Sequence, residues 1–286
     1  MVSLRNCLLT IVLLLNGLIP LAHAADNTDA LAKVIASRSA EDRTRDADRH
    51  PAQTLEFFQL APGMTVAEGL PGGGWYTNVL ANYLGAGGVL YGVNYADRMW
   101  PMIRPGDPAW IAERIAATDR FPAQVATYTT NGIKARGFTF ESVPADVKST
   151  ADHVLLIRAL HNLHRFEKEH GTLSRALASV RDMLKDGGLI GVEQQRAPAT
   201  ATDEWADGSH GYLKEAAVIA LFEQAGFELV ATSEINANPK DKPAAEDTVW
   251  RLPPSLRGSE DDPKRREAML TIGESDRMTL LFRKTQ

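Results

Sequence analysis

The most informative segment of the sequence is a cluster of glycines at residues 66–75, which read VAEGLPGGGW. Here Glu68 precedes Gly72, Gly73 and Gly74. Glycine has no side chain, so the backbone of such a loop can pass close to a ligand and present N–H groups at the start of a helix. A tight structural turn is the alternative interpretation. No Gly-Lys-Ser/Thr follows the glycines, which excludes a P-loop, and the spacing matches a dinucleotide fingerprint poorly.

A second group of candidate residues follows the apolar segment 153–157 and consists of His161, Asn162 and His164. The ordinary pKa of histidine lies near neutrality, so His161 could remove a proton from a reacting group. Helix capping or a structural hydrogen bond is the alternative role. His161 and His164 also have the spacing of a metal-ligand pair, but no third ligand is evident, so we predict no metal site.

Short apolar segments alternate with helical patterns along the chain. This alternation predicts an α/β fold with a doubly wound, mostly parallel, seven-stranded sheet over residues 51–286. The expected strands are 64–67, 89–93, 153–157, 189–193, 227–231 and 278–283, with either 138–141 or 124–128 as the third. The expected helices include 51–59, 76–84, 108–117 and 212–225.

Residues 236–275 are rich in proline and charge, and we expect them to form a long inserted loop before the last strand. In open α/β sheets, ligands bind at the carboxyl ends of the strands. Glu68 and His161 both follow predicted strands at this edge. The sequence therefore predicts one site to which both contribute.

The glycine cluster with its preceding acid resembles motif I of class I S-adenosylmethionine (SAM)-dependent methyltransferases. Segments 151–156, 183–190 and 221–230 are similar to that family's fourth strand, the turn into its fifth strand, and its last helix with the sixth strand, in the same order. A narrower combination resembles a bacterial group of predicted methyltransferases that carry signal peptides. Its segments are 49–52, 71–77, 161–162, 238–241, 250–254 and 272–278.

The resemblance implies SAM as the cofactor. It assigns cofactor binding to Glu68, Gly72, Gly73, Gly74 and Asn94, and catalysis to His161 and Asn162. We expect Gly73 to lie in the tightest part of the turn. Two positions depart from the family pattern: Leu70 replaces the usual first glycine, and Asn94 replaces an acid that binds the ribose hydroxyls. An amide lacks the charge-assisted part of that interaction, about 1 kcal/mol.

The N-terminal residues 1–24 have the features of a secretory signal peptide. Arg5 precedes an apolar stretch, and Ala22-His23-Ala24 fits the cleavage pattern. We therefore expect cleavage before Ala25, a periplasmic or secreted protein, and no stable membrane anchor after cleavage. Residues 25–50 are expected to form a helical extension, which either has a solvated face or acts as a lid over the site.

The composition is that of a globular protein. Of the 286 residues, 44% are hydrophobic and 23% are charged, which argues against a disordered or coiled-coil chain. The net charge of −5 gives no electrostatic case for nucleic-acid binding. The single cysteine, Cys7, lies in the leader, so a mature chain has no thiol for disulfides, catalysis or metal binding.

These observations favour a SAM-dependent methyltransferase that acts on an unknown small molecule in the periplasm. Two alternatives stay open: an exported binding or accessory protein with a degenerate methyltransferase fold, and a metal-assisted enzyme. The binding protein is favoured by Leu70, Asn94 and the leader, because SAM is made in the cytosol and a charged sulfonium does not cross bilayers freely. The sequence carries no signal for an oligomeric state.

Overall fold

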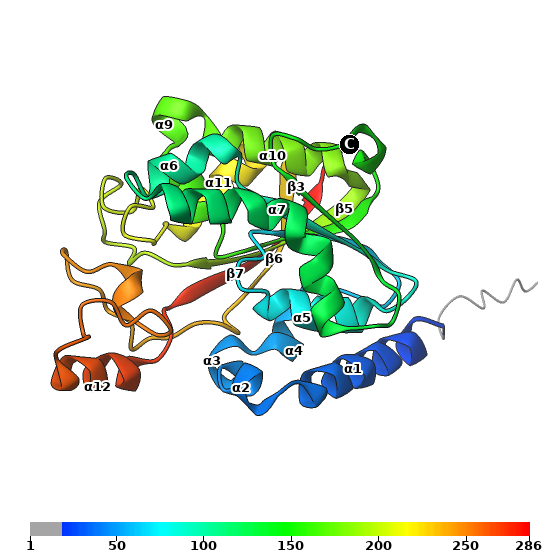
Figure 1. Cartoon of the computed structure of the whole chain (residues 1–286), viewed down its shortest axis with the longest axis horizontal. Coiled ribbons are helices and arrows are strands. Elements are labelled where there is room, and N and C mark those ends of the chain that lie inside the picture. Colours follow the sequence, from blue (N-terminus) through cyan, green and yellow to red (C-terminus); the bar gives the residue numbers. More distant parts are fainter. Residues whose placement is uncertain (1–18) are drawn as a thin grey trace, which may run out of the picture.

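The computed structural model describes residues 19–286, which form one seven-stranded sheet with the order β3-β2-β1-β4-β5-β7-β6 (Figure 1). Neighbouring strands are parallel, except that β7 is antiparallel to both β5 and β6. The predicted doubly wound, mostly parallel α/β fold is thus confirmed. The strands are β1 (Thr65–Gly69), β2 (Val89–Asn94), β3 (Lys134–Thr139), β4 (Ala151–Ile157), β5 (Leu184–Gln195), β6 (Phe227–Ser233) and β7 (Arg277–Lys284).

Helices cover both faces of this sheet (Figure 1). The first three are α1 (Ile19–Ser37), α2 (Ala40–Arg43) and α3 (Asp46–Arg49). The helices up to β3 are α4 (Pro51–Phe57), α5 (Trp75–Leu84), α6 (Trp100–Ile103) and α7 (Pro108–Tyr128). The later helices are α8 (Leu160–Arg165), α9 (Glu167–His170), α10 (Thr172–Met183), α11 (Glu215–Gln224), the short 3₁₀ turn η3 (Val249–Arg251) and α12 (Pro263–Ile272).

The two faces of the sheet bury separate hydrophobic clusters. On β1, Val66 points into the cluster that contains Leu80 of α5, whereas its neighbour Ala67 points into the cluster that contains Leu177 of α10. Strands covered on both faces are apolar at consecutive positions, which is why they were recognisable in the sequence. The carboxyl ends of β1, β2 and β4 meet at one edge, on the left of Figure 1.

Helix α7 is longer than predicted. It continues past Ala117 to Tyr128, so the alternative third strand at 124–128 is its last part, and β3 begins earlier than the predicted residue 138. Pro122 lies inside the helix, where it removes one backbone hydrogen bond. The prediction was wrong because tertiary packing of both halves of the helix outweighs this local loss.

Helix α7 crosses the edge of the sheet, because its two halves pack on opposite faces. Its N-terminal half lies against one hydrophobic cluster through Trp110 and Ile115, and its C-terminal half lies in the other through Phe121. A side chain at Gly137 of β3 would collide with the backbone of Thr118 in the middle of α7. The helix therefore covers edge strand β3 and brings its own side chains to the carboxyl edge of β2.

The segment 236–275 is not simply a loop, because it contains η3 and α12. Asp262 caps α12 by accepting a hydrogen bond from the backbone N–H of Arg265. None of the residues of α12 is buried, so the helix lacks the apolar periodicity that reveals helices in a sequence. Upstream of α12, Arg251 donates to Asp241 over 2.7 Å and both are buried. The insertion is therefore an ordered part of the domain.

The extension predicted for residues 25–50 contains α1, α2 and α3. Helix α1 runs through the predicted cleavage point before Ala25, and most of the predicted signal peptide lies outside the described residues. Leu31 of α1 is fully buried with α4 and α5. Within residues 19–286, no helix combines the length and apolar character needed to cross a membrane.

Candidate functional site

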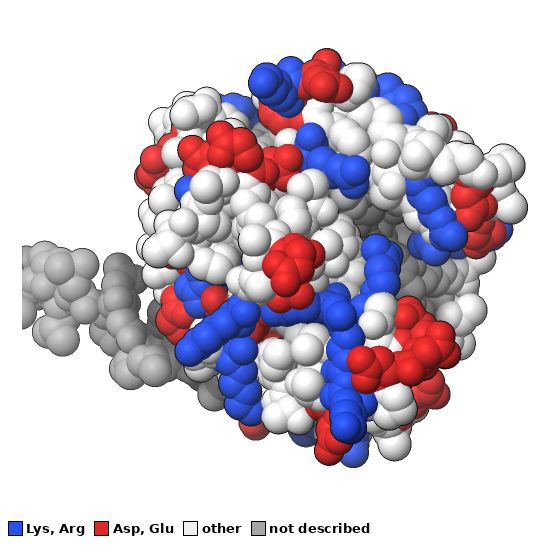
Figure 2. All heavy atoms as spheres, turned by 90° about the vertical axis from the view of Figure 1, so that its left-hand side faces the viewer, with Lys and Arg blue, Asp and Glu red and all other residues white. Residues whose placement is uncertain are grey.

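Two adjoining pockets open at the carboxyl edge of the sheet. The loop pocket, about 520 Å³, lies on the glycine loop, and the arginine pocket, about 1080 Å³, extends from the end of β2 to the end of β4 and the insertion. Both volumes suit small-molecule ligands. Leu70, Arg158 and Trp250 line both pockets, so their ligands would lie side by side. Figure 2, which looks onto this edge, shows Lys and Arg side chains bordering a hollow.

Glu68 ends in the interior rather than in open solvent. Its carboxylate accepts a hydrogen bond of 2.7 Å from the hydroxyl of Thr77 in α5, and only 4% of the residue is exposed. Burial raises the pKa of Glu68 to about 7, although the hydrogen bonds from Thr77 oppose this shift. Glu68 lines the loop pocket and also holds the end of β1 against the helix that follows.

The glycine loop takes left-handed backbone conformations at Leu70 (φ 58°), Gly72 (φ 57°) and Gly74 (φ 81°). A leucine in this region costs about 1–2 kcal/mol, so Leu70 stores strain where the family pattern has glycine. The amides of Gly72 and Gly73 donate to no other described residue. A Cβ added at Gly73 would meet no atom within 4 Å. The loop thus presents free N–H groups to open space.

Gly74, not Gly73, is the tight position of the loop. A Cβ at Gly74 would collide with the hydroxyl of Tyr128 and the amide of Gln124, both on α7. Tyr128 also donates a hydrogen bond of 3.2 Å to the carbonyl of Gly73. The expectation for Gly73 was wrong because α7 packs on the start of α5, a contact that the sequence pattern did not reveal.

Asn94 lies at the end of β2 and lines the arginine pocket, close to the glycine loop. Its side-chain amide donates a hydrogen bond of 2.9 Å to the hydroxyl of Thr118 on α7. The residue is 8% exposed. One of the two N–H donors of the amide is therefore used within the protein, and its carbonyl oxygen accepts no hydrogen bond from a described residue, which leaves this oxygen for a ligand.

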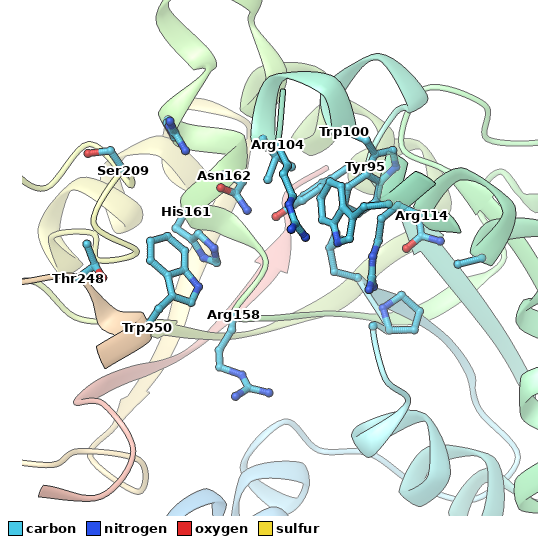
Figure 3. Close-up of a pocket in the computed structure, with 18 of the residues that line it drawn as sticks. Tyr95, Trp100, Arg104, Arg114, Arg158, His161, Asn162, Ser209, Thr248 and Trp250 are labelled. Atoms are coloured by element: carbon cyan, nitrogen blue, oxygen red, sulfur yellow. The ribbon is translucent and has the colours of Figure 1, made fainter. Parts of the chain in front are cut away.

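His161 and Asn162 follow β4 on α8, and both line the arginine pocket (Figure 3). Burial lowers the pKa of His161 to about 4, so its imidazole is neutral at pH 7 and is a weaker base than an ordinary histidine. Its Nδ1 is buried and has no hydrogen-bond partner among the described residues. The ring packs edge-on against Trp250, 5.9 Å between centroids.

His164 contacts the protein backbone. The Nδ1 of His164 lies 2.8 Å from the backbone oxygen of Asp207. Within residues 19–286, no group of three or more His, Cys, Asp or Glu side chains is placed to hold a metal ion.

Arginines dominate the larger pocket. Five of them line it, and no aspartate or glutamate does: the five are Arg104, Arg114, Arg158, Arg165 and Arg257. Figure 3 shows Arg104 and Arg114 extending into the pocket from different elements, whereas Arg158 extends away from them. The Nη1 of Arg158 lies 3.7 Å from the carboxylate of Glu274, which lines the loop pocket. Arg158 directly follows β4 and has a left-handed backbone, φ 55°. With Leu70, it is the second strained residue at this edge, where strain is commonly retained for function.

The loop pocket holds its arginines in a different way. Glu274 accepts hydrogen bonds from Arg45 over 2.7 Å, from Arg49 over 3.0 Å and from Arg277 over 2.5 Å. Burial alone would raise the pKa of Glu274, but these arginines and Arg158 lower it to about 2. Burial, together with Arg158, lowers the pKa of Arg49 to about 9. The extension of residues 25–50 thus contributes Arg45 and Arg49 to the site.

The sequence alone indicated the glycine loop, Asn94 and His161 but not the five arginines that line the arginine pocket. Arg158 carried a usable signal, because it immediately follows a buried strand at the edge where ligands bind. Arg104 directly follows α6 and Arg114 lies in α7, and the guanidinium groups of both lie over the ring of Trp110. Nothing in their local sequence distinguishes them from surface residues.

The fold is shared with methyltransferases of known structure. A methyltransferase from Haloferax volcanii, in complex with the Trm112 methyltransferase activator, matches 90% of this chain and 98% of its own, with a TM-score of 0.51 and 18% identity. The [4+2]-cyclase SpnF matches 91% of this chain and 93% of its own, with a TM-score of 0.50 and 15% identity. The chain therefore has the fold of class I SAM-dependent methyltransferases.

A third similar structure is that of the N-methyltransferase NodS from Bradyrhizobium japonicum, in complex with S-adenosylhomocysteine. It matches 91% of this chain and 99% of its own, with a TM-score of 0.47 and 13% identity. No protein-family model matches the chain, and no curated protein sequence does. The cyclase illustrates that this fold also supports other reactions.

Proposed function

We propose that the protein is a SAM-dependent methyltransferase that acts on a small molecule. One observation carries this proposal: an open glycine loop with free amides after β1 adjoins a polar pocket after β4, in the strand order of the methyltransferase fold. The glycine loop would hold the cofactor, and the arginine pocket would hold the methyl acceptor. Shared lining residues place the two ligands next to each other.

The residues around the loop fit the amino-acid end of SAM. Its carboxylate suits the amides of Gly72 and Gly73 together with Arg49, a buried guanidinium whose Nη1 has no partner among the described residues. The carbonyl oxygen of Asn94 would accept from a ribose hydroxyl. When bound, SAM supplies an electrophilic methyl group on a sulfonium.

The residues of the chain would prepare the acceptor rather than react themselves. The guanidinium groups of Arg114 and Arg158 lower the pKa of a nearby hydroxyl, so an acceptor is more easily deprotonated there. Neutral His161 can form one hydrogen bond to the acceptor through its free nitrogen. Asn162 and Trp250 would orient it, so that much of the rate enhancement comes from positioning.

Calorimetry of the purified protein with SAM and with S-adenosylhomocysteine tests the proposal. We expect saturable binding of both, with Kd values in the micromolar range or tighter, and competition between them. No binding of either at high micromolar concentrations would overturn the proposal.

A second candidate is a binding protein that has lost methyl transfer. It is favoured by Asn94, whose amide is tied to Thr118, and by Leu70, which is strained in the place of a glycine. This protein would bind the ligand of the arginine pocket but neither SAM nor S-adenosylhomocysteine. The same calorimetry therefore separates the two candidates.

For the location, the leader supports a periplasmic protein. We expect N-terminal sequencing of protein from the periplasmic fraction to begin at Ala25. A cytosolic protein that begins at Met1 would contradict this.

A further inference from the structure

We propose that the arginine pocket binds an organic anion, a planar ring that carries a phosphate or carboxylate group, and that this anion is the methyl acceptor. The identification as acceptor rests on the proposed function. The binding itself rests on the charges, rings and buried polar atoms of the pocket.

The positive charge of the pocket is largely uncompensated. Arg114, Arg165 and Arg257 form no ion pair with any described residue, and the Nε of Arg114 is buried without a hydrogen-bond partner. Arg104 pairs with Asp107 over 3.1 Å, but its side chain is 58% exposed. A pocket this cationic stands out in a chain with a net charge of −5. Guanidinium groups bind phosphate and carboxylate through paired hydrogen bonds, which makes these anions the matching ligands.

Aromatic rings hold several of these arginines in place. The guanidinium carbons of Arg104 and Arg114 each lie 5.5 Å from the centre of the Trp110 ring. On the opposite side, that of Arg257 lies 5.2 Å from the ring of Trp250. Stacking restricts the arginines before any ligand arrives and leaves indole surface beside each charge. A ring that carries an anionic group would contact both kinds of side chain at once.

His161 supports the same charge preference. It is 8% exposed, and its Nδ1 has no partner among the described residues, so a polar ligand atom is needed to satisfy it. After burial, the positive charges of Arg158 and Arg165 also disfavour its protonation. Burial and the two arginines together therefore keep this histidine neutral. The arginines would repel a cationic acceptor, and a neutral acceptor would form hydrogen bonds with them that lack the charge-assisted strength of those to an anion.

The loop pocket does not offer the same site. There Glu274 lies between Arg45, Arg49 and Arg277, so an anion would compete with a fixed carboxylate. We therefore expect the anionic group of a ligand to contact Arg104 and Arg114, which line the arginine pocket but not the loop pocket.

Binding of three probes to the purified protein tests the inference: phenyl phosphate, benzoate and phenol, measured by calorimetry at low and high NaCl. We expect at least one of the two anions to bind at least tenfold more tightly than phenol, with an affinity that falls as NaCl rises. Tighter phenyl phosphate would indicate a phosphate ligand, and tighter benzoate a carboxylate. Phenol binding as tightly as both anions would overturn the inference.

Paired variants locate the binding. The double substitution Arg104→Gln with Arg114→Gln should weaken the preferred anion at least tenfold. Arg120→Gln is the matched control, because Arg120 is on the same helix as Arg114, α7, but is 53% exposed and pairs with Glu113. The effect of Arg120→Gln should stay within twofold. Equal affinities of the double variant and the parent would place the anion elsewhere. Circular dichroism checks that each variant is folded.

A separate titration with S-adenosylhomocysteine keeps the two proposals apart. Anion binding without S-adenosylhomocysteine binding would support the anion site but contradict the proposed methyltransferase, and with it the identification of the anion as the methyl acceptor. Binding of S-adenosylhomocysteine without any preference for anions would contradict this inference and leave the methyltransferase standing.

Discussion

The two pockets at the carboxyl edge differ in whether a carboxylate balances the positive charge of their arginines. At the loop pocket, Arg49 and the adjacent Arg277, which does not itself line the cavity, are almost completely buried and share the carboxylate of Glu274. In the arginine pocket, the guanidinium groups are partly or largely exposed and no carboxylate lines the cavity. A buried charge without a partner destabilises a fold, whereas an exposed one stays hydrated. The arginines around Glu274 are therefore part of the folded architecture. In the arginine pocket, Arg114, Arg165 and Arg257 form no ion pair with a described residue and are available to a ligand.

The largest expected effect comes from removing the compensating carboxylate. Glu274→Gln leaves Arg49 and Arg277 buried with less negative charge, so we expect the free energy of unfolding to fall by about 3–5 kcal/mol. Urea denaturation measures this loss. The control is Glu141→Gln, because Glu141 pairs with Arg98 and Arg175 at the surface and should lose less than about 1 kcal/mol. Equal losses of stability in the two variants would mean that Glu274 does not compensate buried charge more strongly than a surface carboxylate does.

Acid should affect the two pockets in different pH ranges. The pKa of His161 is about 4 in the folded state and about 6.5 in the unfolded state, so the unfolded chain binds the proton first and stability falls from pH 6.5 to pH 4. The pKa of Glu274 is about 2, below its unfolded value of about 4.5, so its contribution is lost only as the pH falls from 4.5 to 2.

Denaturation at several pH values measures this difference. Relative to the parent, His161→Gln should lose up to about 2–3 kcal/mol less stability between pH 6.5 and pH 4. His153→Gln is a comparison outside both pockets, because His153 is also buried and its pKa is also lowered to about 4. If His161→Gln and the parent have the same pH profile above pH 4, the histidine is not held neutral by its surroundings.

Filling the glycine loop should separate the ligands of the two pockets. Gly73 lines the loop pocket but not the arginine pocket, and a Cβ added there meets no atom within 4 Å. Gly73→Val should therefore change stability by no more than about 1 kcal/mol but weaken S-adenosylhomocysteine at least about 30-fold, which is about 2 kcal/mol. Phenyl phosphate affinity should stay within threefold.

Gly87→Val is the matched control for this substitution. Gly87 also lacks a left-handed conformation, has room for a Cβ, and lies outside both pockets. Unchanged S-adenosylhomocysteine affinity in a folded Gly73→Val protein would show that the glycine loop is not the cofactor loop.

The smallest effect is expected at Asn94, where one substitution should act on the two ligands with opposite signs. Asn94→Asp restores an acid opposite the ribose and can accept a hydrogen bond from Thr118, so S-adenosylhomocysteine should bind about fivefold more tightly. The same negative charge lies in the arginine pocket and should weaken phenyl phosphate by a similar factor. Weaker binding of S-adenosylhomocysteine would argue that Asn94 does not face the cofactor.

The sequence predicted those parts of the molecule that depend on local pattern. The buried strands and the glycine loop after β1 are continuous in sequence, and both are where they were expected. Helix α7 was predicted too short because Pro122 is a local signal to stop, while the packing of Phe121 on Gly92 is not local. Helix α12 was missed because it buries nothing.

The candidate site was predictable to a similar extent. Glu68 and Asn94 end strands, so their place at the carboxyl edge follows from the fold. The arginines of the larger pocket come from separate segments of the chain, and each resembles a surface residue until tertiary structure brings them together. The shift of the pKa of His161 also depends on burial by distant residues, so its charge state was not readable from its neighbours in the sequence.

The cluster around Glu274 joins Arg45 and Arg49 near the start of the domain to Arg277 in its last strand. The loop pocket is therefore incomplete on any chain that has not yet been synthesised as far as β7. Contacts between such distant parts of a chain form late in folding, because the intervening loop must close first. We expect ligand-binding competence to be acquired in one of the last folding steps, after the sheet around β1 and β4 has formed.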